Sequence, residues 1–127
     1  MILNNFKKKP KELEILGDGK QKKPYLYVTD CVDAMLYGYE NSKDEINVFN
    51  LGVNSTTRVT KIGEIVVEEM GLSDVEFKYT GGKRGWKGDV PHFQFDVSKI
   101  NNLGWKTDLS SDDAVRKATR DILDNNF

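Results

Sequence analysis

The sequence predicts a mixed α/β fold, because segments with strand-like alternation take turns with segments of helical periodicity along the chain. Residues 12–16 and 75–79 alternate polar and apolar side chains, as half-buried strands do. The run INVFNL at 46–51 is apolar on both faces, which is typical of a strand inside a parallel sheet. The chain supplies few partners for such a strand. We therefore expect a small, partly open sheet with packed helices, or a chain that is a piece of something larger.

The first half of the chain contains two predicted helices and two predicted strands before residue 46. Residues 1–9 have helical spacing and end at Pro10, and strand 12–16 leads into a Gly-Asp-Gly turn at 17–19. A short run of β-forming residues at 25–28 predicts a second strand. Thr29 or Asp30 is then the expected N-cap of a helix over 31–40. Its apolar residues repeat at helical spacing and predict a buried stripe: Val32, Met35, Leu36 and Tyr39.

The second half contains three predicted helices. Thr60 is the expected N-cap of a helix that Gly71 ends, and strand 75–79 follows it. An extended segment at 93–96 enters a short helix over 97–103, for which Gly104 is the expected stop. Ser110 or Ser111 is the expected cap of the last helix.

Length and composition indicate one soluble domain over residues 1–127. No apolar run approaches the roughly 20 residues of a membrane span, and the N-terminus lacks a signal peptide's apolar core, so we expect a cytoplasmic protein without a membrane partner. The formal net charge of -1 disfavours a nucleic-acid partner, and the runs KKKPK and KQKK are interpreted as solvated faces. A single cysteine and a single histidine exclude an internal disulfide and a cysteine-based metal site.

The stretch GGKRGWKGDVPHFQFDVSK at 81–99 is the candidate site region. Its glycines allow close backbone approach to a ligand, and Lys83, Arg84 and Lys87 place three cations where they could close over an anion such as a diphosphate. The competing interpretation is a surface loop that binds nothing, since lysine- and glycine-rich loops are common. Trp86 is a large apolar residue inside this polar loop, so it either folds onto the body of the protein or covers a ligand.

Four segments together resemble the NAD-dependent epimerase/dehydratase branch of the extended short-chain dehydrogenases, typified by UDP-glucose 4-epimerase. They are, in order, LEILGDGKQKKPYLYVTDCVDAM, VFNLG, TKIGEIVVEEMGL and RGWKGDVPHFQFDVSKINNLGWKTDLSSDDAV. Each is a weak signal alone, but their order and spacing cover nearly the whole chain. The resemblance is to the C-terminal part of that family, which binds the sugar nucleotide.

The resemblance implies a set of substrate-binding residues. Lys23 stands where relatives have an arginine that reaches the diphosphate, and Arg84 or Lys87 stands for a second such arginine. The backbone from Leu16 through Gly17 to Gly19 corresponds to a segment near the uracil. Asp89 would either anchor the loop or contact the sugar, and plain loop capping is the alternative for that carboxylate.

The two motifs that carry the family's chemistry are absent from this sequence. There is no G-x-x-G-x-x-G turn to hold a dinucleotide. Only Tyr39 and Tyr79 have a lysine four residues on, Lys43 and Lys83, and neither pair falls within a predicted helix. We therefore expect no catalytic residue, no metal and no cofactor in this chain, and NAD in the complete enzyme.

These observations predict the UDP-sugar-binding portion of an NAD-dependent sugar epimerase or dehydratase, inactive alone and completed by an N-terminal NAD-binding half. The alternative is a stand-alone binding or assembly module that pairs with another subunit or with itself. In either case the unpaired run at 46–51 leads us to expect a homo-oligomer of the isolated chain.

Overall fold

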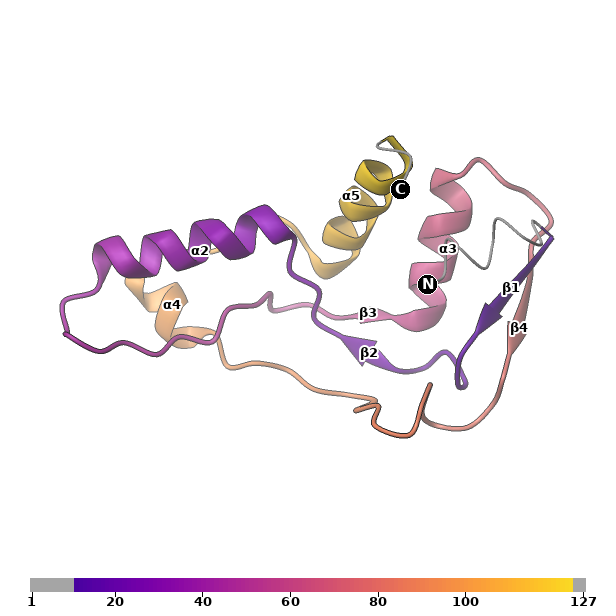
Figure 1. The fold of residues 1–127 in the computed structure, drawn as a ribbon, viewed down its shortest axis with the longest axis horizontal. Helices are drawn as coiled ribbons and strands as arrows, with labels where there is room; N and C mark the ends of the chain where they lie inside the picture. The colour runs from indigo at the N-terminus through magenta and orange to yellow at the C-terminus, as the bar shows by residue number, and fades with distance from the viewer. Residues whose placement is uncertain (1–10, 125–127) are drawn as a thin grey trace.

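The computed structural model describes residues 11–124, so the predicted helix over 1–9 lies outside the described residues. The fold is mixed α/β, as predicted, with two small sheets and helices packed around them (Figure 1). The elements in chain order are β1 Glu12–Ile15, β2 Lys22–Lys23, α2 Val28–Asn41, β3 Thr57–Arg58, α3 Val59–Glu69, β4 Glu76–Tyr79, α4 Ser98–Leu103 and α5 Ser111–Asp124.

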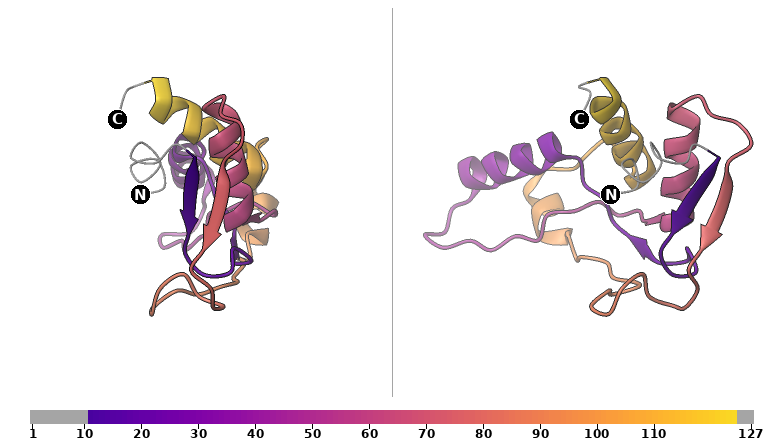
Figure 2. Two further views of the ribbon diagram at one scale, coloured as in Figure 1. Left: turned by 90° about the vertical axis from the view of Figure 1, so that its right-hand side faces the viewer. Right: turned by 45° about the vertical axis from the view of Figure 1, so that its right-hand side comes forward.

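The first sheet pairs the two strands that the alternating patterns predict. β1 and β4 run parallel, with Leu13 opposite Phe77 and Ile15 opposite Tyr79. Leu13 and Ile15 are 1% and 2% exposed, because every second side chain of β1 points towards α3. Helix α3 covers this pair of strands and packs on its other side against α5, which Figure 2 shows from two directions.

The second sheet is a short antiparallel pair, β2 with β3, in which Lys23 lies opposite Thr57. The predicted strand over 25–28 is wrong, and the chain instead enters α2 at Val28 with Tyr27 as N-cap. Pro24 offers no backbone N–H, and the N–H of Tyr25 donates to the Ser111 hydroxyl at 3.0 Å rather than to a strand.

Helix α2 is longer than predicted, and its expected core stripe is wrong. The stripe residues are exposed: Val32 48%, Met35 61%, Leu36 55% and Tyr39 85%. The helix instead buries Ala34 and Gly38, and a Cβ on Gly38 would lie 3.7 Å from Ile100 of α4. α2 therefore rests on α4 through its small residues and turns its large apolar residues outward.

The predicted strand over 46–51 is also wrong. The described chain offers this segment no strand to pair with, and its residues adopt no regular structure. Ile46 is 85% exposed and Val48 is 76% exposed. A strand pattern needs a neighbouring edge to supply its hydrogen bonds, and residues 11–124 contain none at this place.

The remaining helices confirm three of their predicted ends, but the N-cap expected at Thr60 is wrong, because α3 already begins at Val59 with Arg58 as its N-cap. Gly71 and Gly104 follow α3 and α4 with φ of 64° and 123°, a conformation that favours glycine. Ser110 caps α5, since its hydroxyl accepts the N–H of Asp113 at 3.2 Å while the Asp113 carboxylate accepts the Ser110 N–H at 3.2 Å. The two ends of the molecule, α2 with α4 and β1–β4 with α3, are joined by long irregular segments (Figure 1).

Candidate functional site

Two loops that are distant in the sequence meet beside the end of β1. The turn after β1 and the glycine-cation loop, residues 81–89, are in backbone contact: the Gly81 N–H donates to the Gly17 carbonyl at 2.9 Å. A Cβ on Gly17 would lie 3.1 Å from the carbonyl of Arg84, and a Cβ on Gly85 would lie 3.4 Å from the Leu16 Cβ. Leu16, Gly17 and Arg84, three of the predicted site residues, are thus brought together.

An ion pair fastens the glycine-cation loop to β2. Lys23 Nζ lies 2.6 Å from Asp89 Oδ1, and the other carboxylate oxygen accepts the Gly85 N–H at 3.0 Å. The Asp89 side chain is 5% exposed and the Lys23 side chain 27% exposed. The hydrogen bond from Lys23, followed by the one from Gly85, holds the pKa of Asp89 below its usual range. Asp89 therefore anchors the loop, the first of its two predicted roles, and Lys23 is partly neutralised.

Gln21 belongs to the same contact, and the sequence interpretation missed it. Its side chain is wedged between the two loops: Nε2 donates to the Leu16 carbonyl at 3.1 Å and lies 3.4 Å from the Cβ position of Gly85. Gln21 is only 2% exposed, and its Oε1 has no hydrogen-bond partner among the described residues. The available signal was an uncharged residue within a lysine run, where an alternating strand turns Gln21 inward and Lys22 outward.

The cations of the loop lie at the surface. Lys83, Arg84 and Lys87 are exposed, and within residues 11–124 none of them forms an ion pair. Arg84 Nη1 reaches only the Lys87 carbonyl, at 3.5 Å. Since the one carboxylate of the loop is buried beneath it, the outward surface of residues 83–87 is positively charged. Such a surface suits an anionic ligand.

Gly19, the remaining predicted site residue, faces a different part of the molecule. Its carbonyl accepts the Thr60 hydroxyl at 3.1 Å, and a Cβ on Gly19 would lie 2.6 Å from a ring carbon of Tyr79. Gly19 has a φ of 72° and lets the turn pack tightly on the start of α3. The geometry places it with the α3 contact rather than with the cations.

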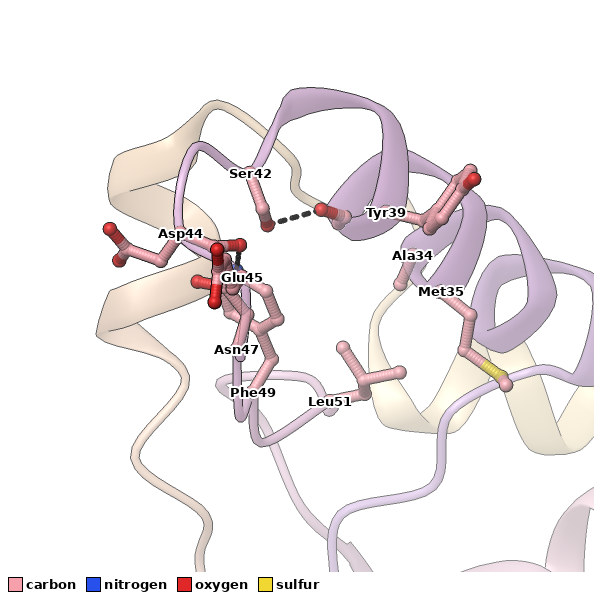
Figure 3. A pocket seen from close by; sticks show the side chains of 10 residues that line it. Ala34, Met35, Tyr39, Ser42, Asp44, Glu45, Asn47, Phe49 and Leu51 are labelled. Carbon is pink, nitrogen blue, oxygen red and sulfur yellow. Dashed lines mark hydrogen bonds between the residues drawn. The ribbon is translucent and has the colours of Figure 1, made fainter.

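A hollow lies at the opposite end of the molecule from the glycine-cation loop, between α2 and the segment 46–51. It is an open pocket of about 450 Å³, lined in part by Met35, Tyr39, Phe49 and Leu51 (Figure 3). Asp44 and Glu45 stand at its rim, and the Ser42 hydroxyl donates to the Gly38 carbonyl beside it (Figure 3). The pocket is part of the exposed apolar surface of α2, far along the chain from the cationic loop.

Neither tyrosine–lysine pair has the geometry of a helical Y-x-x-x-K motif. Tyr39 lies near the end of α2, and Lys43 follows beyond the helix. Tyr79 ends β4, and Lys83 lies in the loop after it. Within the part of the chain that the structure describes, no group of acidic, histidine or cysteine side chains is arranged to hold a metal ion. The described helices are also too short or too polar to cross a membrane.

Comparison with known proteins agrees with the resemblance in the sequence. The model of the NAD-dependent epimerase/dehydratase family matches residues 1–52. A candidate UDP-glucose 4-epimerase of Methanocaldococcus jannaschii is 30% identical over 112 residues, which are 88% of this chain and 34% of that protein. The chain is related to this family.

Two solved structures of enzymes from this family share the fold of this chain. A UDP-galactose 4-epimerase is 28% identical with a TM-score of 0.82, over 99% of this chain and 39% of that one. The UDP-glucose 4-epimerase of Thermotoga maritima, solved with UDP-glucose, is 29% identical with a TM-score of 0.74, over 91% of this chain and 36% of that one. This chain thus spans between a third and two fifths of the length of these relatives.

Proposed function

We propose that this chain is the nucleotide-sugar-binding portion of an NAD-dependent sugar epimerase or dehydratase, corresponding to the C-terminal part of the complete enzyme. The observation that carries the proposal is the loop of residues 81–89, which is fastened by the Lys23–Asp89 pair and presents unpaired cations. A diphosphate supplies the negative charge that these cations lack. Lys23, Arg84, Lys87 and Asp89, with the turn of Leu16, Gly17 and Gly19, remain the proposed substrate-binding residues.

Catalysis belongs, in this proposal, to the N-terminal NAD-binding half of the complete enzyme, whose motifs residues 1–127 do not contain. The proposal is supported by the missing glycine-rich dinucleotide motif and by the two tyrosine–lysine pairs, neither of which lies within one helix. Hydride transfer needs a bound nicotinamide, and proton transfer needs a positioned acid or base. The chain alone then binds a UDP-sugar without converting it, and NAD serves as the cofactor of the complete enzyme.

The exposed apolar surface supports a protein partner at the α2 end. Val32, Met35 and Tyr39 of α2, with Ile46 and Val48 of the neighbouring segment, are each at least 48% exposed. Monomeric soluble proteins rarely expose so many large apolar side chains together. In the complete enzyme we assign this surface to the NAD-binding half. In the isolated chain the same surface leads to self-association.

Calorimetric titration with UDP-glucose and, separately, with NAD tests the binding proposal. We expect weak binding of UDP-glucose and none of NAD, because the pocket is completed between two halves. Arg84→Ala and Lys23→Ala should each abolish the UDP-glucose signal, while Lys11→Ala, an exposed lysine before β1, should leave it unchanged. Absence of UDP-glucose binding at millimolar concentration, or binding that survives both substitutions, contradicts the proposal.

The second candidate function is an assembly module without a small-molecule role, and the same exposed surface favours it. Sedimentation velocity separates the two when it is combined with the titration. Val48→Glu should shift an associated chain towards monomer, whereas Val90→Glu, at a residue 56% exposed outside this surface, should not. Association that depends on Val48 together with no UDP-glucose binding supports the module. A compact monomer at all concentrations contradicts the self-association.

A further inference from the structure

Trp86 is exposed in the folded chain. The sequence leaves two roles for it, packing onto the body of the protein or covering a ligand. The Trp86 side chain is 65% exposed, whereas the other tryptophan, Trp105, is half-buried. Packing onto the body is therefore excluded. Exposed aromatic surface within a polar loop is characteristic of binding surfaces.

The indole of Trp86 has a fixed backing within the glycine-cation loop. A Cβ on Gly88 would lie 2.3 Å from Cζ3 and 2.7 Å from Cη2 of Trp86, so the six-membered ring lies against the α-carbon of that glycine. The Trp86 carbonyl accepts the N–H of Asp89 at 3.1 Å, and Asp89 is held by Lys23. The ring thus rests on an anchored turn and leaves most of its surface open.

The exposed charges beside the ring are all positive, because the one carboxylate of the turn, Asp89, is buried and pairs with Lys23. Arg84 and Lys87 flank Trp86 at two residues and one residue, and Lys83 precedes them. All three are exposed, and across the described residues 11–124 they form no ion pair. A simple anion satisfies these cations but gives the indole nothing to contact. A flat uncharged ring contacts the indole but leaves the cations unpaired.

A nucleotide satisfies both, because its base stacks on an aromatic side chain while its phosphates pair with cations. The position of Trp86 agrees with a ligand whose base stacks on the indole while its phosphates pair with the neighbouring cations. Gly85, its immediate neighbour, contacts Leu16 of the turn after β1, and Arg84 contacts Gly17. The indole and the cations therefore lie on one loop beside the turn after β1, where a single ligand can contact both.

We propose that Trp86 is the stacking surface for the base of a nucleoside diphosphate, whose phosphates are paired by Lys83, Arg84 and Lys87. The inference rests on the proposed nucleotide-sugar function and adds to it the residue that recognises the base. Trp86 is then a binding residue that distinguishes a nucleotide from a bare diphosphate.

Tryptophan fluorescence tests this proposal directly, because the chain has two tryptophans. In Trp105→Phe, Trp86 is the sole tryptophan, and excitation beyond the absorption band of tyrosine reports on it alone. Titration of this variant with UDP should quench the emission to saturation, since a stacked base changes the environment of the indole. Inorganic pyrophosphate should bind through the cations with little quenching, and its binding is followed by calorimetry.

Substitution of Trp86 separates stacking from a structural role. Trp86→Leu should weaken UDP binding about 10-fold, the range expected for one lost stack, and should leave pyrophosphate binding within about twofold. Trp86→Phe keeps a ring and should retain most of the UDP affinity. Phe93→Leu, at an aromatic residue 37% exposed beyond the loop, is the matched control and should change neither affinity.

The outcomes are distinct. UDP binding that is unchanged in Trp86→Leu, or UDP and pyrophosphate affinities that fall equally, overturns the stacking while leaving the proposed function intact. Absence of UDP binding to both the wild-type chain and Trp105→Phe overturns the proposed function, and the stacking with it.

Discussion

Asp89→Asn is the substitution that most directly tests how the glycine-cation loop is held. The change keeps the shape of the side chain and its ability to accept the Gly85 N–H, but it removes the charge that pairs with Lys23 at 2.6 Å. A hydrogen bond between charged groups contributes about 1.5–3 kcal/mol to stability. The Asp89 side chain is 5% exposed, so solvent replaces little of this interaction. We therefore take about 2 kcal/mol as the free energy by which the Lys23–Asp89 pair stabilises the closed loop.

This free energy translates into a measurable opening of the loop. Since about 1.4 kcal/mol is a factor of ten, a loss of about 2 kcal/mol raises the open fraction of the loop about 30-fold. Native-state hydrogen exchange reads that opening at the Gly85 and Asp89 amides, which donate to Asp89 Oδ2 and to the Trp86 carbonyl. We expect both amides to exchange about 30-fold faster in Asp89→Asn, while amides within α3 keep their rates.

The control is Asp108→Asn, at an exposed aspartate with no hydrogen bond among the described residues. It should leave both amide rates unchanged. Lys23→Met should reproduce the effect of Asp89→Asn, and the double variant should show no further loss, because the two substitutions remove one interaction. Equal rates in Asp89→Asn and the wild type, or additive effects in the double variant, would refute the anchoring role.

The pH dependence of the same exchange has a determined sign. The folded pKa of Asp89 is lowered by Lys23 and Gly85, so the carboxyl binds its proton more readily when the loop is open. The stabilisation is fully present above the ordinary pKa of aspartate and is lost as pH falls through the lower folded pKa. After correction for intrinsic exchange, protection of these amides should therefore decrease below about pH 4.

Three further predictions concern stability and are read from urea unfolding. Glu69→Gln should lower the unfolding midpoint more than Glu64→Gln, because Glu69 pairs with two arginines of α5, and equal midpoints would contradict this. Those arginines lower the pKa of Glu69, so the difference between the two variants should shrink below about pH 4, where the carboxyl takes up a proton. Ile100→Ala should cost about 3 kcal/mol, since Ile100 is 0% exposed between α4 and α2, and a loss under about 1 kcal/mol would mean that the packing is loose. Gly19→Ala should destabilise the fold more than Gly81→Ala. Both glycines have positive φ, which alone costs alanine about 1 kcal/mol. An added Cβ would lie 2.2 Å from the Thr60 hydroxyl oxygen at Gly19 but would meet nothing within 4 Å at Gly81, so equal losses of stability would contradict the contact at Gly19.

The candidate site was only partly predictable from the sequence. The glycine-cation loop and its cations are visible as a dense local pattern, and Lys23 and Asp89 were named through the family resemblance. Gln21 was missed because the local pattern indicates only that its side chain turns inward, whereas its contacts depend on two loops that meet in space. Gly19 was also named through the family resemblance, and the structure adds that its carbonyl accepts the Thr60 hydroxyl of α3.

The sequence by itself determined the features that depend on short-range chemistry. Alternation placed β1 and β4, helical spacing placed α3 and α5, and the glycines at 71 and 104 marked where helices end. The family relation was likewise present in the order of its motifs, and comparison with known proteins confirmed it.

The tertiary structure alone decided which apolar residues are covered. The stripe of Val32, Met35 and Tyr39 carries the pattern of a buried helix face, and the run at 46–51 carries that of a buried strand. The three stripe residues are nevertheless exposed, and so are Ile46 and Val48 of the run. A pattern records that a side chain is suited to burial, whereas burial itself requires a second surface at the right place. Residues 11–124 provide that surface for the apolar residues of β1 and α3 but not for the large apolar residues of α2, and this difference cannot be read from the apolar positions alone.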